Sequence, residues 1–315
     1  MTPFVFDIAL TVAFRGITRR SGVLFEGPAG WAEWSPFVEY DDAEAAAWLR
    51  AAREAANLGH PAPVRDAVEV NGIVPALAPE AAAARAVASG CRTIKIKVAA
   101  AGESLADDIA RVAAVRAALP DARIRVDANG GWRLAEAVDA LRELAPLGLE
   151  YAEQPCASVD DLARLRARDL GVPIAADESI RRAADPMRVA RAGAADIAVL
   201  KVQPLGGVRD CLRLAEELGL PVVVSSAVET SVGLRAGVAL AAALPELPYA
   251  CGLETARLLT GDVVDGPLTP EAGSLAVRDV VVDPDLLRAH AAGEELERFW
   301  LARLARVTEI VEGKR

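Results

Sequence analysis

The chain of 315 residues is longer than one ordinary hydrophobic core usually fills, so we expect one large domain and a smaller one. Hydrophobic residues make up 53% and charged residues 25% of the sequence, which excludes a disordered protein and a coiled coil. The net charge of -10 argues against a nucleic-acid or anionic-membrane surface, because such surfaces need clustered positive charge.

The N-terminal part of the chain predicts a small α+β unit. Its expected elements are β-like segments at about 4–14 and 22–26, an aromatic-rich turn at 30–37, and a helix from Asp41 to Leu58. A further helix over 284–309 should pack back against this unit through its apolar face. That face consists of Leu286, Leu287, Leu296, Trp300 and Leu301. We therefore predict a capping domain of residues 1–66, to which the C-terminal segment 266–315 returns.

Residues 67–265 predict a parallel barrel. Short apolar runs alternate with amphipathic stretches of about a dozen residues, which indicates parallel strands joined by helices. The eight expected strands lie at 67–71, 93–98, 123–128, 149–153, 173–177, 196–202, 221–226 and 249–254. The first strand is not followed by the G-x-G-x-x-G turn of dinucleotide-binding sheets, so a closed α/β barrel is favoured over an open sheet.

Four polar residues recur where successive strands are expected to end. They are Asp127 in I-R-V-D-A-N, Glu153 in Y-A-E-Q-P, Asp177 in I-A-A-D-E-S and Lys201 in V-L-K-V-Q-P. Their separations of 26, 24 and 24 residues match one strand-and-helix unit, so they occupy equivalent places on neighbouring strands. Because the C-terminal strand ends of a parallel barrel form the active-site rim, we expect these residues to meet at one site.

Three of these residues predict a metal site. Carboxylates gathered in a dry site repel one another unless a cation holds them, and Asp127, Glu153 and Asp177 would supply only oxygen ligands. Such ligands favour Mg²⁺, with Mn²⁺ as a substitute. His60 and His290 belong to no comparable motif, and we interpret both as structural or surface residues.

The segment T-I-K-I-K-V at 93–98 places Lys95 and Lys97 on one face of a strand. Because helices should cover the apolar face, both lysines are predicted to point into the barrel. Arg125 should share the inward face of its strand with Asp127 and add positive charge. A metal beside lysines suits removal of a proton from the carbon next to a carboxylate, since the metal stabilises the negative charge and a lysine takes the proton.

Five motifs together resemble the muconate-lactonizing-enzyme-like branch of the enolase superfamily over nearly the whole chain. They are K-I-K at 95–97, D-A-N at 127–129, E-Q-P at 153–155, A-D-E-S at 176–179 and K-V-Q-P at 201–204. The resemblance implies a (β/α)7β TIM-like barrel with an α+β capping domain, and the same three metal ligands. It also implies that Lys97 and Lys201 lie on opposite faces of the substrate. Lys95, which shares the inward face of its strand with Lys97, is a further catalytic candidate.

Within this branch, further segments resemble the o-succinylbenzoate synthase family. They are R-G-I-T-R-R-S-G at 15–22, G-W-A-E-W-S-P-F at 30–37, Arg125, and S-S-A-V-E-T-S-V-G at 225–233. The resemblance implies syn loss of water from a cyclohexadiene carboxylate that carries a succinyl chain, a step of menaquinone biosynthesis. Lys97 would remove the ring proton and then protonate the departing hydroxyl, while Lys201 would stabilise the negative charge.

Contacts with the substrate are assigned to three places. Arg125 would face the anionic substrate, and the loop at 15–22 would close over the succinyl group with Arg19 or Arg20 near its carboxylate. Ser225 and Ser226 could donate hydrogen bonds to the same group. Each loop residue also has a plainer interpretation, as solvated charge or as a loop cap.

Other functions stay open at this stage. Two lysines flanking one carbon can protonate either face, so an N-succinylamino acid racemase or a related epimerase is the main alternative. A dipeptide epimerase is disfavoured because C-G-L-E-T at 251–255 lacks the D-x-D that such enzymes use. A metal-free Schiff-base enzyme would leave the three acids unexplained, and a non-catalytic barrel would leave the whole polar set unexplained.

The cysteines and the N-terminus bear on cellular location. Cys91, Cys156, Cys211 and Cys251 are widely separated, so we expect neither a zinc site nor disulfide bonds. The sequence shows no signal peptide and no apolar run of membrane-spanning length. We therefore predict a cytoplasmic enzyme with a small-molecule carboxylate substrate and no membrane insertion. The sequence does not fix the oligomeric state, and a monomer is compatible with it.

Overall fold

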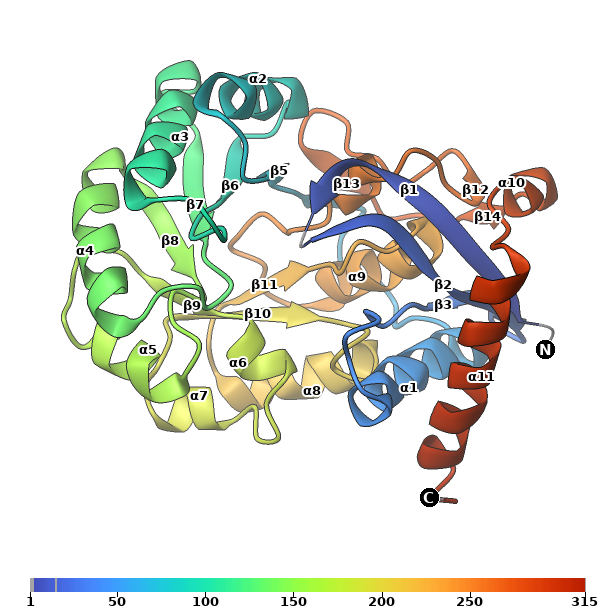
Figure 1. The fold of residues 1–315 in the computed structure, drawn as a ribbon. Helices are drawn as coiled ribbons and strands as arrows, with labels where there is room; N and C mark the ends of the chain where they lie inside the picture. Colours follow the sequence, from blue (N-terminus) through green and yellow to red (C-terminus); the bar gives the residue numbers. More distant parts are fainter. Residues whose placement is uncertain (1–2, 15, 315) are drawn as a thin grey trace.

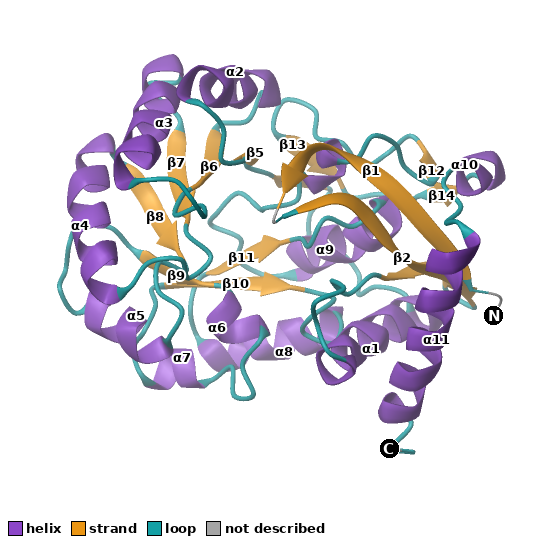
Figure 2. Ribbon diagram, in the orientation of Figure 1, coloured by secondary structure: helices purple, strands orange, loops and turns teal. Residues whose placement is uncertain are grey.

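The structure, a computed structural model, describes residues 3–14 and 16–314. A curled parallel sheet is surrounded by helices, and a smaller antiparallel sheet lies beside it (Figures 1 and 2). In spatial order the parallel strands are β5 (Gly72–Val74), β6 (Thr93–Lys97), β7 (Arg123–Asp127), β8 (Leu149–Glu153), β9 (Ile174–Ala176), β10 (Ile197–Lys201) and β11 (Val222–Ser225). This arrangement confirms the predicted α/β barrel class.

Helices follow the barrel strands and cover the outside of the sheet (Figure 2). They are α2 (Pro79–Ser89), α3 (Leu105–Ala118), α4 (Leu134–Leu144), η1 (Ala145–Leu147), α5 (Val159–Arg166), α6 (Glu178–Arg181), α7 (Arg188–Arg191), α8 (Val208–Leu218) and α9 (Ser231–Ala243). Local sequence sets several of their ends. The Ser104 and Ser158 side chains cap the starts of α3 and α5, and left-handed Gly90 and Gly219 follow α2 and α8. None of the described helices is both long and apolar enough to cross a bilayer.

The barrel closes through a short eighth segment. The backbone of Cys251 exchanges hydrogen bonds with Glu69 (2.7 Å) and Asn71 (2.9 Å) on one side, and Gly252 donates to Val224 (2.8 Å) on the other. The strand predicted at 249–254 is therefore reduced to isolated bridges.

The first predicted strand, 67–71, is partly wrong. Residues Ala67–Glu69 form β4, which pairs outside the parallel sheet with β13 (Ser274–Ala276). The barrel strand is β5, directly after it. The apolar alternation identified an extended segment correctly, but its partner lies some 200 residues later in the chain and could not be identified from local sequence.

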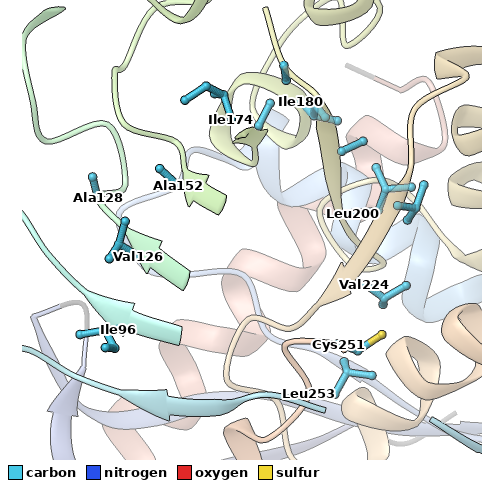
Figure 3. Packing of buried hydrophobic residues seen from close by; sticks show 14 of the residues in the cluster. Ile96, Val126, Ala128, Ala152, Ile174, Ile180, Leu200, Val224, Cys251 and Leu253 are labelled. Atoms are coloured by element: carbon cyan, nitrogen blue, oxygen red, sulfur yellow. The ribbon is translucent and has the colours of Figure 1, made fainter. Parts of the chain in front are cut away.

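The outer faces of the barrel strands pack on the helices. Ile96, Val126, Leu200 and Val224 come from four strands and belong to one buried cluster (Figure 3). That cluster also contains helical residues such as Leu141. Lys95 and Lys97 occupy the alternate positions of β6, which directs them away from this layer and toward the barrel interior.

The small sheet, here called the capping sheet, consists of β1 (Phe4–Phe14), β2 (Ile17–Gly27) and β3 (Gly30–Trp34). It packs against α1 (Asp42–Leu58) and α11 (Glu294–Val311). The Asp41 side chain accepts a hydrogen bond from the Glu44 amide, which fixes the start of α1 where the sequence predicts it. Trp300 of α11 is completely buried and meets Trp34 edge to face at 5.5 Å. The C-terminal helix therefore returns to the N-terminal unit, as predicted.

Two predictions for this region are wrong in detail. Residues 30–34 form a strand rather than a turn. The helix expected over 284–309 is divided into α10 (Pro284–Ala289) and α11, because the backbone between them hydrogen bonds to β1 instead of continuing the helix. The Asp7 amide donates to the His290 carbonyl, and the Ala292 amide donates to the Val5 carbonyl, both at 2.9 Å. The remaining short elements are η2 (Thr255–Leu258), β12 (Val264–Asp265) and β14 (Val281–Val282).

Glu33 of β3 joins the capping sheet to the barrel. Its carboxylate accepts hydrogen bonds from the amides of Thr230 (3.0 Å) and Gly233 (3.2 Å), so it caps the N-terminus of α9. The Ser35 hydroxyl donates to its other oxygen at 2.6 Å. Burial, reinforced by repulsion from Glu229, raises the pKa of Glu33 to about 7.

Glu33→Gln is expected to flatten the pH dependence of folding stability. A raised pKa means that the folded state binds this proton more tightly than the unfolded state does, so stability falls as pH rises from 4.5 to about 7. Each tenfold difference in proton affinity between the two states corresponds to about 1.4 kcal/mol of stability. Glutamine cannot ionise but keeps an acceptor for α9. Urea unfolding of both proteins across this pH range would show the difference, and parallel pH profiles would contradict the prediction.

Candidate active site

A cavity at the C-terminal ends of the barrel strands collects most of the predicted site residues. The predicted residues that line it are Lys95, Asp127, Lys201, Ser225 and Ser226. Phe14 of β1 and Phe37, which follows β3, contribute to its wall from the N-terminal part of the chain. The open space measures only about 30 Å³, so the N-terminal segment encloses the site closely in this structure.

Strand register explains why residues so far apart in sequence lie at this end of the barrel, although Lys97, Glu153 and Asp177 do not line the cavity itself. Lys97 lies opposite Asp127, and Asp127 lies opposite Glu153 on the next strand. Asp177 directly follows β9, and Lys201 is the last residue of β10. The spacing of about one strand-and-helix unit has therefore placed these side chains at one end of the barrel.

Two lysines and one arginine pair with the three carboxylates. Lys95 Nζ lies 2.8 Å from Glu153 Oε1 and 3.4 Å from Asp127 Oδ2. Lys201 Nζ lies 2.6 Å from Asp177 Oδ2, while Arg181 Nε lies 2.8 Å from the other oxygen of Asp177. Glu153 Oε2 is buried and has no hydrogen-bond partner. The site thus holds closely packed charges of both signs.

Burial and neighbouring charges shift the protonation of these groups in different directions. Burial raises the pKa of Glu153 to about 7; Lys95 opposes this rise, and Asp127 adds to it. Burial alone would raise the pKa of Asp177, but Arg181 and Lys201 outweigh it and lower the pKa. Burial alone would lower the pKa of Lys95, but Glu153 and Asp127 outweigh it and keep this ammonium charged.

Comparisons with known proteins decide the family. Residues 5–56 match the family model "Enolase N-terminal domain-like", and residues 78–281 match "Enolase C-terminal domain-like". The o-succinylbenzoate synthase of Thermobifida fusca is 61% identical, over 97% of this chain and 95% of that protein. The chain belongs to the o-succinylbenzoate synthase family of the enolase superfamily. The family member from Mycolicibacterium smegmatis is 54% identical, over 95% of this chain and 93% of that protein.

Solved structures agree on the fold. Muconate lactonizing enzyme from Pseudomonas fluorescens aligns with a TM-score of 0.78 and 23% identity, covering 92% of this chain and 98% of that one. N-succinyl Arg/Lys racemase from Bacillus cereus aligns with a TM-score of 0.79 and 20% identity, covering 92% and 97%. At 23% and 20% identity these comparisons show a shared fold and no more.

Membership of the enolase superfamily brings a divalent metal cofactor. Among the described residues, no three Asp, Glu, His or Cys side chains are grouped as a ready metal site. Lysine ammoniums lie against the carboxylates instead. The donor chemistry nevertheless fits a hard cation, because three carboxylates face one region and the buried Glu153 Oε2 lacks a partner. The donor set of Asp127, Glu153 and Asp177 therefore fits such an ion.

Arg125 lies deeper in the barrel than the other predicted substrate contacts, Ser225 and Ser226. It does not line the cavity; its side chain is fully buried inside the barrel and stacks on the Tyr151 ring at 4.6 Å. Its guanidinium donates to Glu150 Oε2 (2.5 Å) and to the Ala250 carbonyl (2.7 Å). The inward direction was predicted correctly, but two residues along a strand place Arg125 about 6.6 Å deeper than Asp127.

The remaining substrate candidates have partners within the protein. The Ser226 hydroxyl donates to the Gly252 carbonyl at 2.6 Å, and the Ser225 hydroxyl approaches the same oxygen at 3.5 Å. Arg19 is exposed and pairs with Asp7, while Arg20 is buried behind the cavity wall. Neither arginine lines the cavity, and Arg15 lies outside the described residues.

Sequence reasoning missed two supporting residues. Arg181 binds Asp177 and also donates to the Tyr40 hydroxyl at 2.6 Å, which links the barrel to the segment after β3. Gln154 accepts hydrogen bonds from the amides of Asp177 (2.9 Å) and Ser179 (3.1 Å). The i,i+4 spacing of Asp177 and Arg181 was a usable signal, and Gln154 lies inside the E-Q-P motif itself.

Proposed function

We propose that this chain catalyses the loss of water from 2-succinyl-6-hydroxy-2,4-cyclohexadiene-1-carboxylate, giving o-succinylbenzoate for menaquinone biosynthesis, with Mg²⁺ as its cofactor. The chain is then a carbon-oxygen lyase. The observation that carries the choice of substrate is the 61% identity, over almost the full length, to an o-succinylbenzoate synthase. The acids and lysines at the barrel rim supply the groups that this reaction needs.

Lys97 is proposed as the base that takes the proton from the ring carbon bearing the carboxylate. The electrons of that bond enter the ring as the bond to the hydroxyl breaks, and the proton on Lys97 leaves with the hydroxyl as water. Lys201 is proposed to stabilise the negative charge from the opposite side. Strands β6 and β10 are separated by three other strands of the curled sheet, which supports opposite positions for these lysines.

Lys95 is proposed to remain a cation that orients acidic groups. Its contacts with Glu153 and Asp127 keep it protonated, so it suits neither proton removal nor covalent attack. Asp127, Glu153 and Asp177 are proposed to hold Mg²⁺, with Mn²⁺ as a substitute. The bound ion would supply Lewis acidity toward the substrate carboxylate.

The test is turnover of the cyclohexadiene substrate by the purified chain in the presence of Mg²⁺. Appearance of aromatic product absorbance is the expected result. N-succinyl amino acids in deuterated water provide the comparison, because an N-succinylamino acid racemase would exchange their α-proton. Exchange without any dehydration would overturn the proposed function in favour of that racemase. Replacing Mg²⁺ with Mn²⁺ in the same assay tests the choice of ion.

A further inference from the structure

A buried arginine of the capping sheet lies directly behind two walls of the cavity. Arg20 of β2 is only 2% exposed. Its Nε donates to the Val228 carbonyl at 2.9 Å, and its Nη2 donates to the Ser35 hydroxyl at 2.9 Å and to the Ser35 carbonyl. Its guanidinium carbon lies 4.6 Å from the centre of the Phe37 ring. Val228 and Phe37 both line the cavity, so Arg20 contacts the wall without reaching the interior.

The loop that receives this contact has an unusual backbone. Val228 has a φ of 62°, in the left-handed region that β-branched residues rarely adopt. A conformation of this kind persists only where surrounding contacts hold it. The Ala227 amide donates to the Glu229 carboxylate at 2.6 Å, which holds one side of the bend, and Arg20 holds the Val228 carbonyl.

A second contact from the capping sheet fixes the end of the same loop. Glu33 accepts hydrogen bonds from the Thr230 amide and hydroxyl, at 3.0 and 2.5 Å. Arg20 also interacts electrostatically with both Glu33 and Glu229. Loop 225–230 follows barrel strand β11, but it is held by side chains of capping-sheet strands β2 and β3.

We propose that Arg20 is a positioning residue that holds loop 225–230 in the conformation which shapes the substrate-facing wall of the cavity. Docking of the capping sheet and shaping of the wall then occur together. The proposal rests on the proposed function only in taking this cavity as the substrate site. Arg20 lies in the segment R-G-I-T-R-R-S-G and Val228 in the segment S-S-A-V-E-T-S-V-G. Under this proposal both segments contribute to shaping the cavity wall.

The kinetic test compares Arg20→Met and Arg20→Lys with Arg306→Met. Arg20→Met should raise KM for dehydration about tenfold or more with a smaller change in kcat, because charged hydrogen bonds that shape the binding wall are lost. Arg20→Lys keeps the positive charge, so its KM should lie between those of the wild type and Arg20→Met. Arg306 of α11 has a side chain that is 44% exposed and pairs with Asp42, so Arg306→Met should leave KM unchanged. A lower melting temperature with wild-type KM in Arg20→Met would overturn the proposal.

A double-mutant cycle with Val228→Gly separates loop positioning from general stability. Glycine adopts a positive φ without steric strain, so less is needed to hold the loop at position 228. Arg20→Met should therefore raise KM by a smaller factor in the Val228→Gly background than in the wild type. An equal increase in KM in both backgrounds would show that Arg20 does not stabilise the backbone conformation at Val228.

Hydrogen exchange gives a readout that needs no substrate. Amides in 225–230 should exchange faster in Arg20→Met than in wild type or Arg306→Met, with the β6–β8 amides unchanged. Unchanged exchange in this loop would overturn the proposal. Because this measurement is independent of turnover, it tests Arg20 even if the chain does not dehydrate the cyclohexadiene substrate.

Discussion

Lys97→Ala is expected to lower kcat for dehydration by about 10²- to 10⁴-fold, the usual contribution of a general base. Lys97 lies opposite Asp127 in the strand register, and its neighbours Ile96 and Val98 belong to the buried layer outside the barrel. Alanine removes the amine and leaves that apolar layer intact, so the fold should survive. Product absorbance measures the rate, and circular dichroism with Mg²⁺ titration checks that the variant is folded and binds metal.

Lys97→Arg separates proton transfer from simple charge. Arginine retains the positive charge, but its guanidinium does not release a proton under physiological conditions. If Lys97 is the base, Lys97→Arg should be about as inactive as Lys97→Ala. Substantial activity in the arginine variant would show that position 97 acts through charge alone, and near-normal turnover in the alanine variant would exclude it from the reaction.

The sequence predicts the site better than it predicts the individual strands, and the reason is periodicity. Asp127, Glu153, Asp177 and Lys201 recur once per strand-and-helix unit, so any parallel barrel brings them to the same rim regardless of exact strand boundaries. Alternation along β6 similarly predicts the direction of Lys95. The strand-and-helix spacing and the alternation along β6 are both local repeats, so they can be recognised directly in the sequence.

Features that depend on distant partners could not be predicted in this way. The pairing of β4 with β13 and the break between α10 and α11 both depend on backbone hydrogen bonds to remote segments. Arg125 shows a second limit, since alternation gives the direction of a side chain but not its depth. Glu150 and the Ala250 carbonyl hold Arg125 in the layer below the cavity, and neither partner is evident from the R-V-D sequence.

Glu153→Gln is expected to weaken Mg²⁺ binding by more than about 100-fold, because changes merely next to metal ligands already cost about 10- to 100-fold. Dehydration activity should be lost with it. Glu153 is buried, one of its oxygens pairs with Lys95, and the other has no hydrogen-bond partner. Glutamine is nearly the same size but carries no charge, so the variant tests the negative charge rather than the shape of the site. Isothermal titration with Mg²⁺ measures the affinity directly.

Glu150→Gln is the matched control, because Glu150 lies on the same strand and undergoes the same chemical change. Its carboxylate pairs with Arg125 beneath the cavity, so its loss should lower stability but leave Mg²⁺ affinity within about twofold. If both variants lose Mg²⁺ equally, the effect reflects general loss of barrel structure. If Glu153→Gln binds Mg²⁺ like the wild type, Glu153 is not a ligand, and the unpartnered oxygen must serve another purpose.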